Sequence, residues 1–334
     1  MKIGRWLFWV ILSAVILTGC GRHSQQEENS MIKLAFISKD LDHYWYQQVK
    51  SGMESKCQEM GMKLQCFNSD YDDDTCIRQV KQVIREEYDG LMICATEQKL
   101  GSEIGKLCAE AEIPVVTIDD SMRDADGKEF PYVGMATREV GSIGGAALAK
   151  MAKEKEFPLE NGDVRILEID VPRLSVFRER LTGYEDALLT NSPLNRENIT
   201  VIDVSTGMYE ANCEIVKRYF QENVPDKNTY WIICGVNDDC ALAPMHVLKE
   251  MGVPAEQIIA CGLGGYELSI REFEAQNRNY ITVMTQPDVE GAQAAEMLHE
   301  YLVNGEELDT SIILGGAVAT CDNYMLYFED SGNK

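Results

Sequence analysis

Histidine is scarce in this chain of 334 residues, which contains four, and His23 lies in a polar stretch near the N-terminus. The patterns GxSxG and HExxH are both absent. Serine hydrolases and zinc peptidases depend on such patterns, which hold a nucleophile, a base or metal ligands at fixed spacings. No pair of catalytic acids and no metal cluster is evident in the sequence either. We therefore expect a protein without enzyme activity, bound metal or cofactor.

Nucleotide-binding fingerprints are lacking too. Residues Gly101–Lys106 imitate a phosphate-binding loop, but the segment is one residue short and no Ser or Thr follows the lysine. Residues Cys261–Gly265 are rich in glycine but do not have the GxGxxG spacing. A helix start explains the first segment better, and a glycine-rich strand end explains the second.

Basic residues are few relative to acidic ones, 31 against 55, and the formal net charge is -24. A field of this sign repels phosphate backbones and anionic lipid surfaces, which argues against nucleic-acid binding. The 45% of hydrophobic and 26% of charged residues are those of an ordinary globular protein. The length suits two domains or one large α/β unit, and the strong negative charge favours a monomer.

The first residues differ from the rest of the chain. Lys2 and Arg5 form a basic start, and Trp6–Leu17 is an apolar run without a charge. This run is shorter than the ~20 residues that a membrane-spanning helix needs. Residues 1–19 are therefore predicted to be a signal peptide.

The tetrapeptide Leu17-Thr18-Gly19-Cys20 resembles a bacterial lipobox. The resemblance implies that Cys20 is lipidated, becomes the mature N-terminus and anchors the protein to the membrane outside the cytoplasm. The alternative is an ordinary cleaved signal with an incidental cysteine. Residues 20–31 are mostly polar and predict a flexible tether between the lipid and the folded body.

Ten further cysteines follow Cys20, and they form no CxxC pair. Four of them lie in apolar, strand-like runs, where a thiol behaves as a small hydrophobic group. These four are Cys66, Cys94, Cys234 and Cys261. We therefore expect buried free thiols and no disulfide framework.

From residue 32 onward, short apolar runs alternate with longer amphipathic ones, a pattern that predicts strands alternating with helices. The first series has strands at Ile32–Ser38, Met62–Asn68, Gly90–Cys94 and Val115–Ile118, and helices near Trp45–Met60, Thr75–Glu87 and Ser102–Glu112. A helix at Arg138–Lys155 and a polar stretch at 156–162 lead to the second series.

The second series has the same alternation, which requires parallel sheets. Its strands are predicted at Val164–Asp170, Ile199–Val204, Tyr230–Cys234, Ile258–Gly262 and Tyr280–Thr285, with helices near Ser175–Leu189, Glu210–Glu222, Asp239–Met251 and Leu268–Ala275. A last helix at Asp288–Asn304 and a strand near Ser311–Leu314 complete the pattern. The predicted fold class is α/β, with two Rossmann-like parallel-sheet lobes, and ligands of such folds bind at the carboxyl ends of the strands.

Polar and aromatic side chains gather after the predicted strands. Aromatic rings stack on the C–H faces of a sugar, while carboxylate, guanidinium and amide groups hold its hydroxyls. The strand ends therefore favour a site for a neutral sugar. The groups concerned are Lys39, His43, Tyr44, Trp45 and Tyr46 after the first strand, Asp119 and Asp120 after the fourth, Arg178 at a helix start, and Asn237 and Asp238 in the second series.

These segments resemble the type I periplasmic sugar-binding proteins, and among them the arabinose-binding members, over residues 32–330. The most specific matches are Lys33–Lys39 with Trp45-Tyr46, Ile93–Ser102, Val115–Asp120, Arg178–Gly183 and Gly235–Asp238. The resemblance implies a periplasmic-binding-protein-like type I fold with two lobes joined by a hinge. The N-terminal lobe would be residues 32–140, completed by about 287–310; residues 141–162 would form a helix and crossover; the C-terminal lobe would be 163–286, with a final hinge-crossing segment at about 311–330.

The resemblance also implies roles for single residues. Lys39 and Asp119 or Asp120 would hold sugar hydroxyls, Trp45 and Tyr46 would stack on the sugar or wall the pocket, Met135 would line it, and Arg178 and Asn237 would contact the ring oxygen or hydroxyls. Each has an ordinary alternative: Trp45 as a core residue, the two aspartates as loop caps, and Arg178 as a surface cation, with Arg173 as the pocket cation in its place.

Several positions depart from the arabinose-binding pattern. His43 stands in place of a carboxylate, Val236 in place of a pocket methionine, and Gly264 in place of an asparagine, with Glu267 three residues further on. An unmatched hydroxyl or pocket group costs ~1 to 3 kcal/mol, enough to change which sugar is preferred. We keep His43, Asp238 and Glu267 as candidate ligand-binding residues, although His43 could be an exposed loop residue and Glu267 could cap a helix.

The expected function is that of a lipid-anchored solute-binding protein, which captures a monosaccharide such as an arabinose- or galactose-like aldose between two lobes and delivers it to an ABC permease. The alternative is a sugar-sensing receptor of the same fold that signals to a membrane histidine kinase or chemoreceptor. A transcription regulator of this fold would need an N-terminal helix-turn-helix, where this chain is predicted to have a signal peptide.

Overall fold

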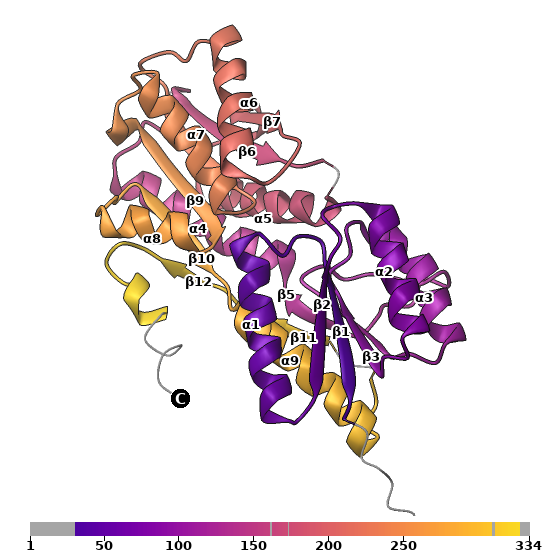
Figure 1. Ribbon diagram of the computed structural model, residues 1–334. Helices are drawn as coiled ribbons and strands as arrows, with labels where there is room; N and C mark the ends of the chain where they lie inside the picture. The colour runs from indigo at the N-terminus through magenta and orange to yellow at the C-terminus, as the bar shows by residue number, and fades with distance from the viewer. Residues whose placement is uncertain (1–30, 161, 173, 309–310, 328–334) are drawn as a thin grey trace, which may run out of the picture. The chain divides into compact units, whose positions relative to one another are not determined.

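The computed structural model describes residues 31–327 except 161, 173 and 309–310. The predicted signal peptide, Cys20 and Arg173 lie outside the described residues. The described chain folds into two six-stranded sheets flanked by helices (Figure 1). This confirms the predicted α/β class with two parallel-sheet halves. No helix in the described ranges has the length and apolar character needed to cross a membrane.

The first sheet has the strand order β11-β5-β4-β3-β1-β2, and all its pairs are parallel. Its strands are β1 (Lys33–Ser38), β2 (Lys63–Asn68), β3 (Gly90–Ile93), β4 (Val115–Ile118), β5 (Tyr132–Met135) and β11 (Ser311–Leu314). Successive residues of β1 enter different cores: Leu34 and Phe36 on one face, Ala35 and Ile37 on the other. Side chains alternate along a strand, so a run that is apolar throughout is buried on both faces.

The second sheet has the order β12-β10-β9-β8-β6-β7. Its strands are β6 (Val164–Asp170), β7 (Ile199–Asp203), β8 (Tyr230–Gly235), β9 (Ile258–Gly264), β10 (Tyr280–Met284) and β12 (Ala317–Ala319), of which β12 alone pairs antiparallel among those described. Sequence reasoning missed β5 and β12, because both are short and lack an extended apolar run. The other strands agree with the predicted ranges within a few residues.

Helices cover both faces of each sheet, as parallel strands require. The first sheet carries α1 (Tyr44–Glu59) and α9 (Pro287–His299) against one core, and α2 (Asp73–Arg85) and α3 (Gly101–Glu110) against the other. The second sheet carries α4 (Thr137–Glu154), α5 (Ser175–Asn191), α6 (Tyr209–Glu222), α7 (Asp238–Glu250) and α8 (Glu267–Glu274). Short helical turns occur at 98–100, 196–198, 255–257, 300–304 and 324–327.

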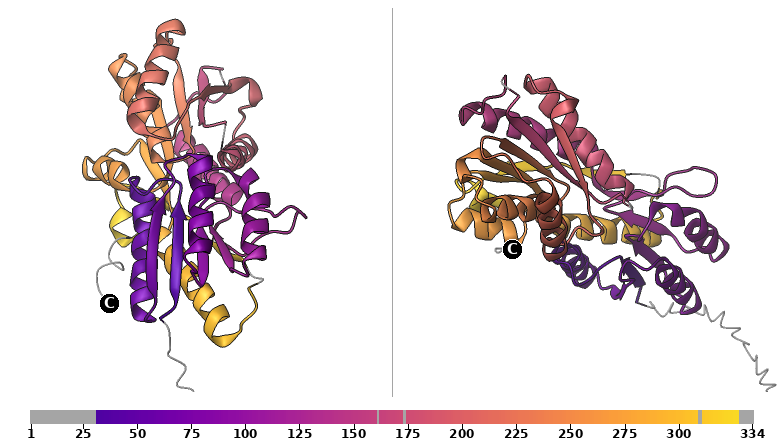
Figure 2. Two further views of the ribbon diagram at one scale, coloured as in Figure 1. Left: turned by 45° about the vertical axis from the view of Figure 1, so that its right-hand side comes forward. Right: turned by 90° about the horizontal axis from the view of Figure 1, so that it is seen from above.

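The chain passes between the two sheets at three places. It first leaves the first sheet after β5. The next helix, α4, packs on α5 and on strands of the second sheet. It returns between β10 and α9, and leaves again between β11 and β12. Figures 1 and 2 show the gold α9 among the indigo and violet elements of the first sheet, although it is far from them in sequence. The two sheets are therefore joined by three crossings of the chain.

Two helix pairs approach closely through glycine. A Cβ on Gly183 of α5 would lie 2.1 Å from the backbone oxygen of Arg138 in α4, and one on Gly141 of α4 would lie 2.0 Å from that of Arg180. In the first half, a Cβ on Gly291 of α9 would lie 1.9 Å from the oxygen of Val49 in α1. These contacts set the helix separation, and through α5 they position the side chains that follow β6.

Candidate functional site

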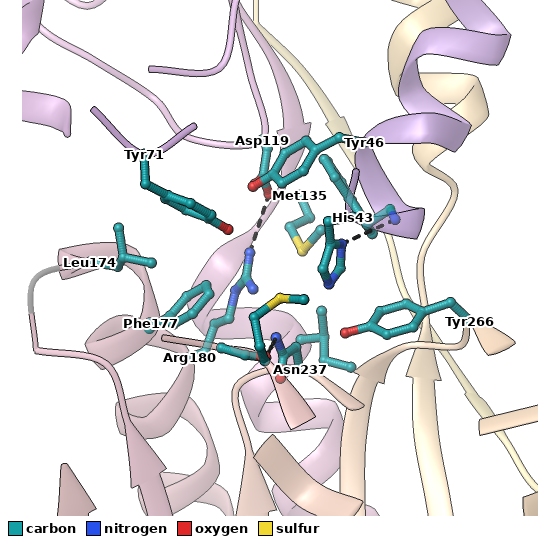
Figure 3. Close-up of a pocket in the computed structure, with 14 residues that line it drawn as sticks. His43, Tyr46, Tyr71, Asp119, Met135, Leu174, Phe177, Arg180, Asn237 and Tyr266 are labelled. Atoms are coloured by element: carbon teal, nitrogen blue, oxygen red, sulfur yellow. Dashed lines mark hydrogen bonds and ion pairs between the residues drawn. The ribbon is translucent and has the colours of Figure 1, made fainter. Parts of the chain in front are cut away.

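A cavity lies at the carboxyl ends of the strands, where ligands of parallel α/β sheets bind. Residues of both halves line it, and Figure 3 shows their side chains pointing toward a common space. The first half contributes His43, Trp45, Tyr46, Tyr71, Asp119 and Met135; the second contributes Leu174, Phe177, Arg180, Gly207, Met208, Asn237, Leu263 and Tyr266.

A buried ion-pair cluster supports the first-half wall. Lys39 follows β1, is 1% exposed, and pairs through Nζ with Oδ2 of Asp120; Oδ2 of Asp119 lies 3.7 Å from the same nitrogen. Burial opposes the charge on Lys39, but Asp120, Cys94 and Asp119 outweigh it and raise the pKa of Lys39 well above its ordinary value. Lys39 and Asp120 therefore stand behind the cavity wall and hold Asp119, which faces the cavity.

Asp119 has a φ of 63°, in the left-handed region that suits a short polar side chain. Its carboxylate accepts hydrogen bonds from the Tyr46 hydroxyl at 3.4 Å and from Nη2 of Arg180 at 3.3 Å. Burial and then the neighbouring Asp120 raise the pKa of Asp119, while Lys39 and Arg180 act in the opposite direction. Asp119 is thus an acceptor whose direction is set by donors on both sides.

Arg180 is the cation that reaches the cavity from the second half. It is 4% exposed, donates to the backbone oxygen of Val236 at 3.1 Å and to Asp119, and its guanidinium carbon lies 4.9 Å from the centre of the Phe177 ring. Burial opposes its charge, but Asp119 and then Asp120 outweigh burial and raise the pKa of Arg180. Figure 3 shows the dashed contact between Arg180 and Asp119 across the cavity.

Arg178, which the resemblance favoured as the pocket cation, does not line the cavity. Its guanidinium binds Asp170 at 2.5 Å, Glu185 at 3.3 Å and Glu168 at 3.5 Å. Two residues along an α-helix are about 200° apart around its axis, so Arg178 and Arg180 point to opposite sides of α5. The arginine of α5 that lines the cavity is therefore Arg180, while Arg178 lies in an acidic cluster away from it. The sequence offered one signal, since Glu185, seven residues further along α5, pairs with Arg178.

His43 lies just before α1 and caps it, because its Nδ1 accepts from the backbone N–H of Trp45 at 3.2 Å. Its ring meets the Tyr266 ring edge to face at 5.3 Å, and its Nε2 lies 3.8 Å from Oδ2 of Asp239. His43 lines the cavity and is not an exposed loop residue.

Asn237 lines the cavity and also caps α7. Its Oδ1 accepts from the N–H of Cys240 at 2.8 Å, and its Nδ2 donates to the oxygen of Gly207 at 3.0 Å. These bonds fix the amide plane and leave one N–H and one lone pair for a ligand.

Two other predicted residues do not line the cavity. Asp238 is fully buried and accepts from the N–H groups of Gly265 and Tyr266 and from the hydroxyls of Tyr280 and Thr282. It anchors the segment after β9 and is a structural acceptor. Glu267 begins α8, is exposed and pairs with Arg271 four residues on, which agrees with the helix-start alternative.

Gly264 explains why no asparagine stands at this strand end. Its φ is 125°, and a Cβ there would lie 2.5 Å from Cε1 of Tyr266. The Tyr266 ring therefore takes the space that a side chain at 264 would need. Sequence reasoning missed Tyr266, as it missed Tyr71, Phe177 and Met208. Tyr266 lies two residues after β9 and Tyr71 three residues after β2, so the position after a strand could have indicated these two.

The thiol of Cys94 and the carboxylates of Asp119 and Asp120 offer ligand atoms within 4.8 Å of one another, the one such group among the described residues. The Lys39 ammonium already binds this pair of carboxylates. Burial raises the pKa of the Cys94 thiol well above its ordinary value, so the thiol stays protonated. The donor set suits an ammonium better than a metal ion.

Comparison with known proteins agrees with this architecture. The sequence profile of the periplasmic binding protein domain matches residues 34–307, so the chain belongs to that family, as the sequence resemblance predicted. It is 25% identical over 308 residues to the L-arabinose-binding periplasmic protein of Escherichia coli K12, covering 90% of each chain. It is 22% identical over 332 residues to the ABC transporter L-arabinose-binding periplasmic protein of Azospirillum brasilense, covering 96% of each.

Solved structures show the same fold. An ABC transporter solute binding protein from Mycobacterium smegmatis with bound glycerol superposes with a TM-score of 0.73 at 21% identity, covering 89% of this chain and 96% of that one. These relatives are binding proteins and not enzymes, which confirms the expectation of a non-catalytic role.

Proposed function

We propose that this protein is a lipid-anchored, extracytoplasmic solute-binding protein that captures a neutral monosaccharide, an arabinose- or galactose-like aldose, and delivers it to an ABC permease. The observation that carries the proposal is the cavity in which Asp119 and Arg180 meet among aromatic rings of both halves. The names of the relatives, two of which bind L-arabinose, favour the same class of ligand.

The polar part of the cavity suits hydroxyl groups. A hydroxyl donates one hydrogen bond and accepts others, so it can donate to the Asp119 carboxylate while it accepts from Arg180. Asn237 adds an amide whose plane is fixed by two hydrogen bonds. Two vicinal hydroxyls could thus be held at once, and an analogue without them would leave buried groups unpaired.

The aromatic part suits the faces of a sugar ring. Trp45 and Tyr46 are both buried and meet edge to face at 4.9 Å, so their positions are fixed before a ligand arrives. Phe177 lies opposite in Figure 3, under the guanidinium of Arg180. Rings of this kind contact the apolar C–H faces of a pyranose or furanose.

The charges at the cavity favour a neutral ligand. Lys39 is paired with Asp120, and Arg180 is paired with Asp119, so each buried cation near the cavity is already compensated. A phosphate or carboxylate would face these carboxylates and the overall negative charge of the chain. A neutral sugar meets no such opposition.

Because both halves line the cavity, a ligand within it contacts both. A ligand that binds the closed arrangement more tightly than the open one shifts the population toward closure. In the proposed role, the closed and loaded form is what the permease recognises, and the lipid on Cys20 holds the protein at the membrane.

The test is a thermal-unfolding screen of the purified full-length protein against arabinose, galactose, fucose, xylose, ribose and glucose, with glucose 6-phosphate and galacturonate as anionic comparisons. A ligand present at about 100 times its dissociation constant should stabilise the folded state by ~2.7 kcal/mol. The proposal expects one neutral aldose to raise the midpoint and the anions to leave it unchanged. Glu267→Gln, on the exposed start of α8, is the matched control and should respond as the wild type does. If only an anion, or no sugar at all, raises the midpoint, the proposal is wrong.

A further inference from the structure

Part of the cavity is lined by a short segment that is anchored on both sides. Gly207 and Met208 line the cavity just before α6. The backbone oxygen of Gly207 accepts from Nδ2 of Asn237 at 3.0 Å, and a Cβ on Gly207 would lie 2.8 Å from that nitrogen. On the other side of Met208, Tyr209 begins α6 and is bound to α7. The place of Met208 is therefore determined by the residues before and after it.

Tyr209 is held by α7 at both of its ends. Its backbone N–H donates to Oδ1 of Asp239 at 3.1 Å, and its hydroxyl lies 2.7 Å from Nδ1 of His246. Asp239 and His246 are seven residues apart in α7, which is two turns, so they lie on the same face of that helix. The Tyr209 and His246 rings also meet edge to face at 5.8 Å. Tyr209 thus fixes the start of α6 against α7, which packs beside it (Figure 1).

The hydrogen bonds continue from His246 to α8. Nε2 of His246 lies 3.0 Å from Oε1 of Glu272, whose Oε2 accepts from Nδ2 of Asn277 at 2.5 Å. Burial raises the pKa of Glu272, but the hydrogen bonds from His246 and Asn277 outweigh burial and bring the pKa below its ordinary value. A charged carboxylate only accepts, so Nε2 carries a proton and Nδ1 of the neutral ring accepts from the Tyr209 hydroxyl. The acceptor for Tyr209 is therefore itself held in place.

Asp239 connects Tyr209 to a second residue of the cavity. Asp239 is 6% exposed, and while its Oδ1 accepts from Tyr209, its Oδ2 accepts from the Tyr266 hydroxyl at 2.9 Å. The Tyr266 ring faces the cavity (Figure 3). Together with Met208 and Leu263 it forms the part of the lining that we call the apolar wall. Two of the three residues of this wall are thus tied to α7 through Tyr209 and Asp239.

We propose that Tyr209 and His246 are positioning residues that hold the apolar wall in place and so determine how strictly the cavity rejects a sugar hydroxyl directed at it. The proposal rests on the function proposed above, because it concerns the selectivity of the same cavity. Neither residue lines the cavity, so each acts through Met208 and Tyr266. A fixed apolar wall leaves such a hydroxyl without a hydrogen-bond partner, whereas a wall that moves admits water to it.

The first arm of the test uses the sugar-free, full-length protein. Hydrogen–deuterium exchange with mass spectrometry follows peptides that contain residues 204–210 and 263–268. Tyr209→Phe keeps the ring but cannot bind His246, so these peptides should exchange about threefold faster or more, while the rest of α6 and α7 is unchanged. Tyr219→Phe, which removes a hydroxyl ten residues further along α6, is the control and should exchange as the wild type does. Unchanged exchange in Tyr209→Phe, or faster exchange spread evenly over both helices, overturns the proposal.

Two replacements of His246 separate its two hydrogen bonds. His246→Asn places an amide oxygen near the position of Nδ1, where it accepts from Tyr209, but is too short to reach Glu272. His246→Gln reaches Glu272 but presents a CH₂ group to Tyr209. The proposal expects His246→Asn to exchange like the wild type and His246→Gln to exchange like Tyr209→Phe, and any other order contradicts it. The Tyr209 hydroxyl also meets the Cys213 thiol, so Cys213→Ala is a second control and should exchange like the wild type.

The second arm measures selectivity by calorimetry with D-fucose and D-galactose, which differ by one hydroxyl. The wild type should prefer D-fucose about fivefold or more, and Tyr209→Phe and His246→Gln should lower this ratio to about twofold or less. Tyr219→Phe and Cys213→Ala should keep the wild-type ratio. A general loss of stability weakens both sugars alike, so an unchanged ratio in Tyr209→Phe, or a wild-type ratio near one, refutes the proposal. If neither sugar binds the wild type, the proposed ligand is wrong, and the exchange experiment decides the positioning role by itself.

Discussion

Replacing Arg180 by lysine should weaken sugar binding far more than the same replacement at Arg178, although the two residues are two positions apart in one helix. Arg180 lines the cavity, and its guanidinium donates to both Val236 and Asp119. A lysine keeps the positive charge but presents a single ammonium, which cannot reproduce the forked geometry. The variant therefore separates the geometry of the cation from its charge.

The magnitude follows from these contacts. At 4% exposure, Arg180→Lys loses at least one buried hydrogen bond to a charged group, which is worth about 1.5 to 3 kcal/mol. The loss also frees Asp119, the acceptor that we assign to a sugar hydroxyl. At about 1.4 kcal/mol for each tenfold change, the dissociation constant should rise roughly 10- to 100-fold. Arg178 is 43% exposed and contacts only the acidic cluster, so Arg178→Lys should change it less than about threefold.

Isothermal calorimetry with the sugar that gives the largest thermal shift is the appropriate assay. Thermal unfolding without sugar provides the stability of each variant, so that a loss of binding can be distinguished from a loss of fold. If Arg178→Lys weakens binding and Arg180→Lys does not, the cavity is not the ligand site. If the two variants weaken binding equally, the arginines act by stabilising α5 and not by contacting a ligand in the cavity.

Three further predictions follow from other parts of the molecule. Burial, followed by the nearby Glu185, raises the pKa of Glu168 to about 8, so the free energy of unfolding of the wild type should fall as the pH rises from about 4.5 to 8. In chemical denaturation, Glu168→Gln should not show that fall and should be the more stable protein at pH 8.5, by on the order of a few kcal/mol. Gly183→Ala should lower the unfolding midpoint by several degrees, because its Cβ would lie 2.1 Å from a backbone oxygen of α4, whereas Gly315→Ala, with no atom within 4 Å, should leave the midpoint unchanged. Cys20→Ala should move the protein from the membrane fraction to the soluble fraction on cell fractionation, and an unaltered distribution would contradict lipidation.

The sequence predicted the sheets well because their signal is local. Runs such as Lys33–Ser38 and Ile258–Gly264 are apolar at nearly every position, which in a parallel sheet means burial on both faces. The strand at Tyr132–Met135 carries a glycine and follows a proline, so its apolar signal is too short to stand out. It is held by pairing with β4 and β11, and the second of these partners lies far away in the chain. No local sequence pattern predicts strand pairing of that kind.

The candidate site also contains some residues that the sequence predicted and others that it did not. Five residues were predicted from their position after a strand, and the structure places them on the cavity: His43, Trp45, Tyr46, Asp119 and Asn237. Which arginine of α5 reaches the cavity, Arg180 or Arg178, depends on the rotation of that helix, and Arg180 was not predicted. Glycine contacts with α4 fix this rotation, and the buried carboxylates beside β6 draw the other arginine away. Such packing between distant segments decides which side chain reaches the ligand.

The Tyr266 ring occupies the space that a side chain at position 264 would need, and this affects which sugars the cavity can bind. An amide at 264 would offer a donor and an acceptor to a hydroxyl, whereas the Tyr266 ring offers an apolar edge and its hydroxyl is bound to Asp239. Leu263 and Met208 also line the cavity from this half. A hydroxyl directed at this wall would lose its hydrogen bonds, at a cost of ~1 to 3 kcal/mol, while a C–H group would pack against it. Among neutral aldoses, the cavity should therefore favour those that present hydrogen or methyl toward Tyr266, and matched pairs such as D-fucose and D-galactose, which differ by one hydroxyl, measure that preference directly.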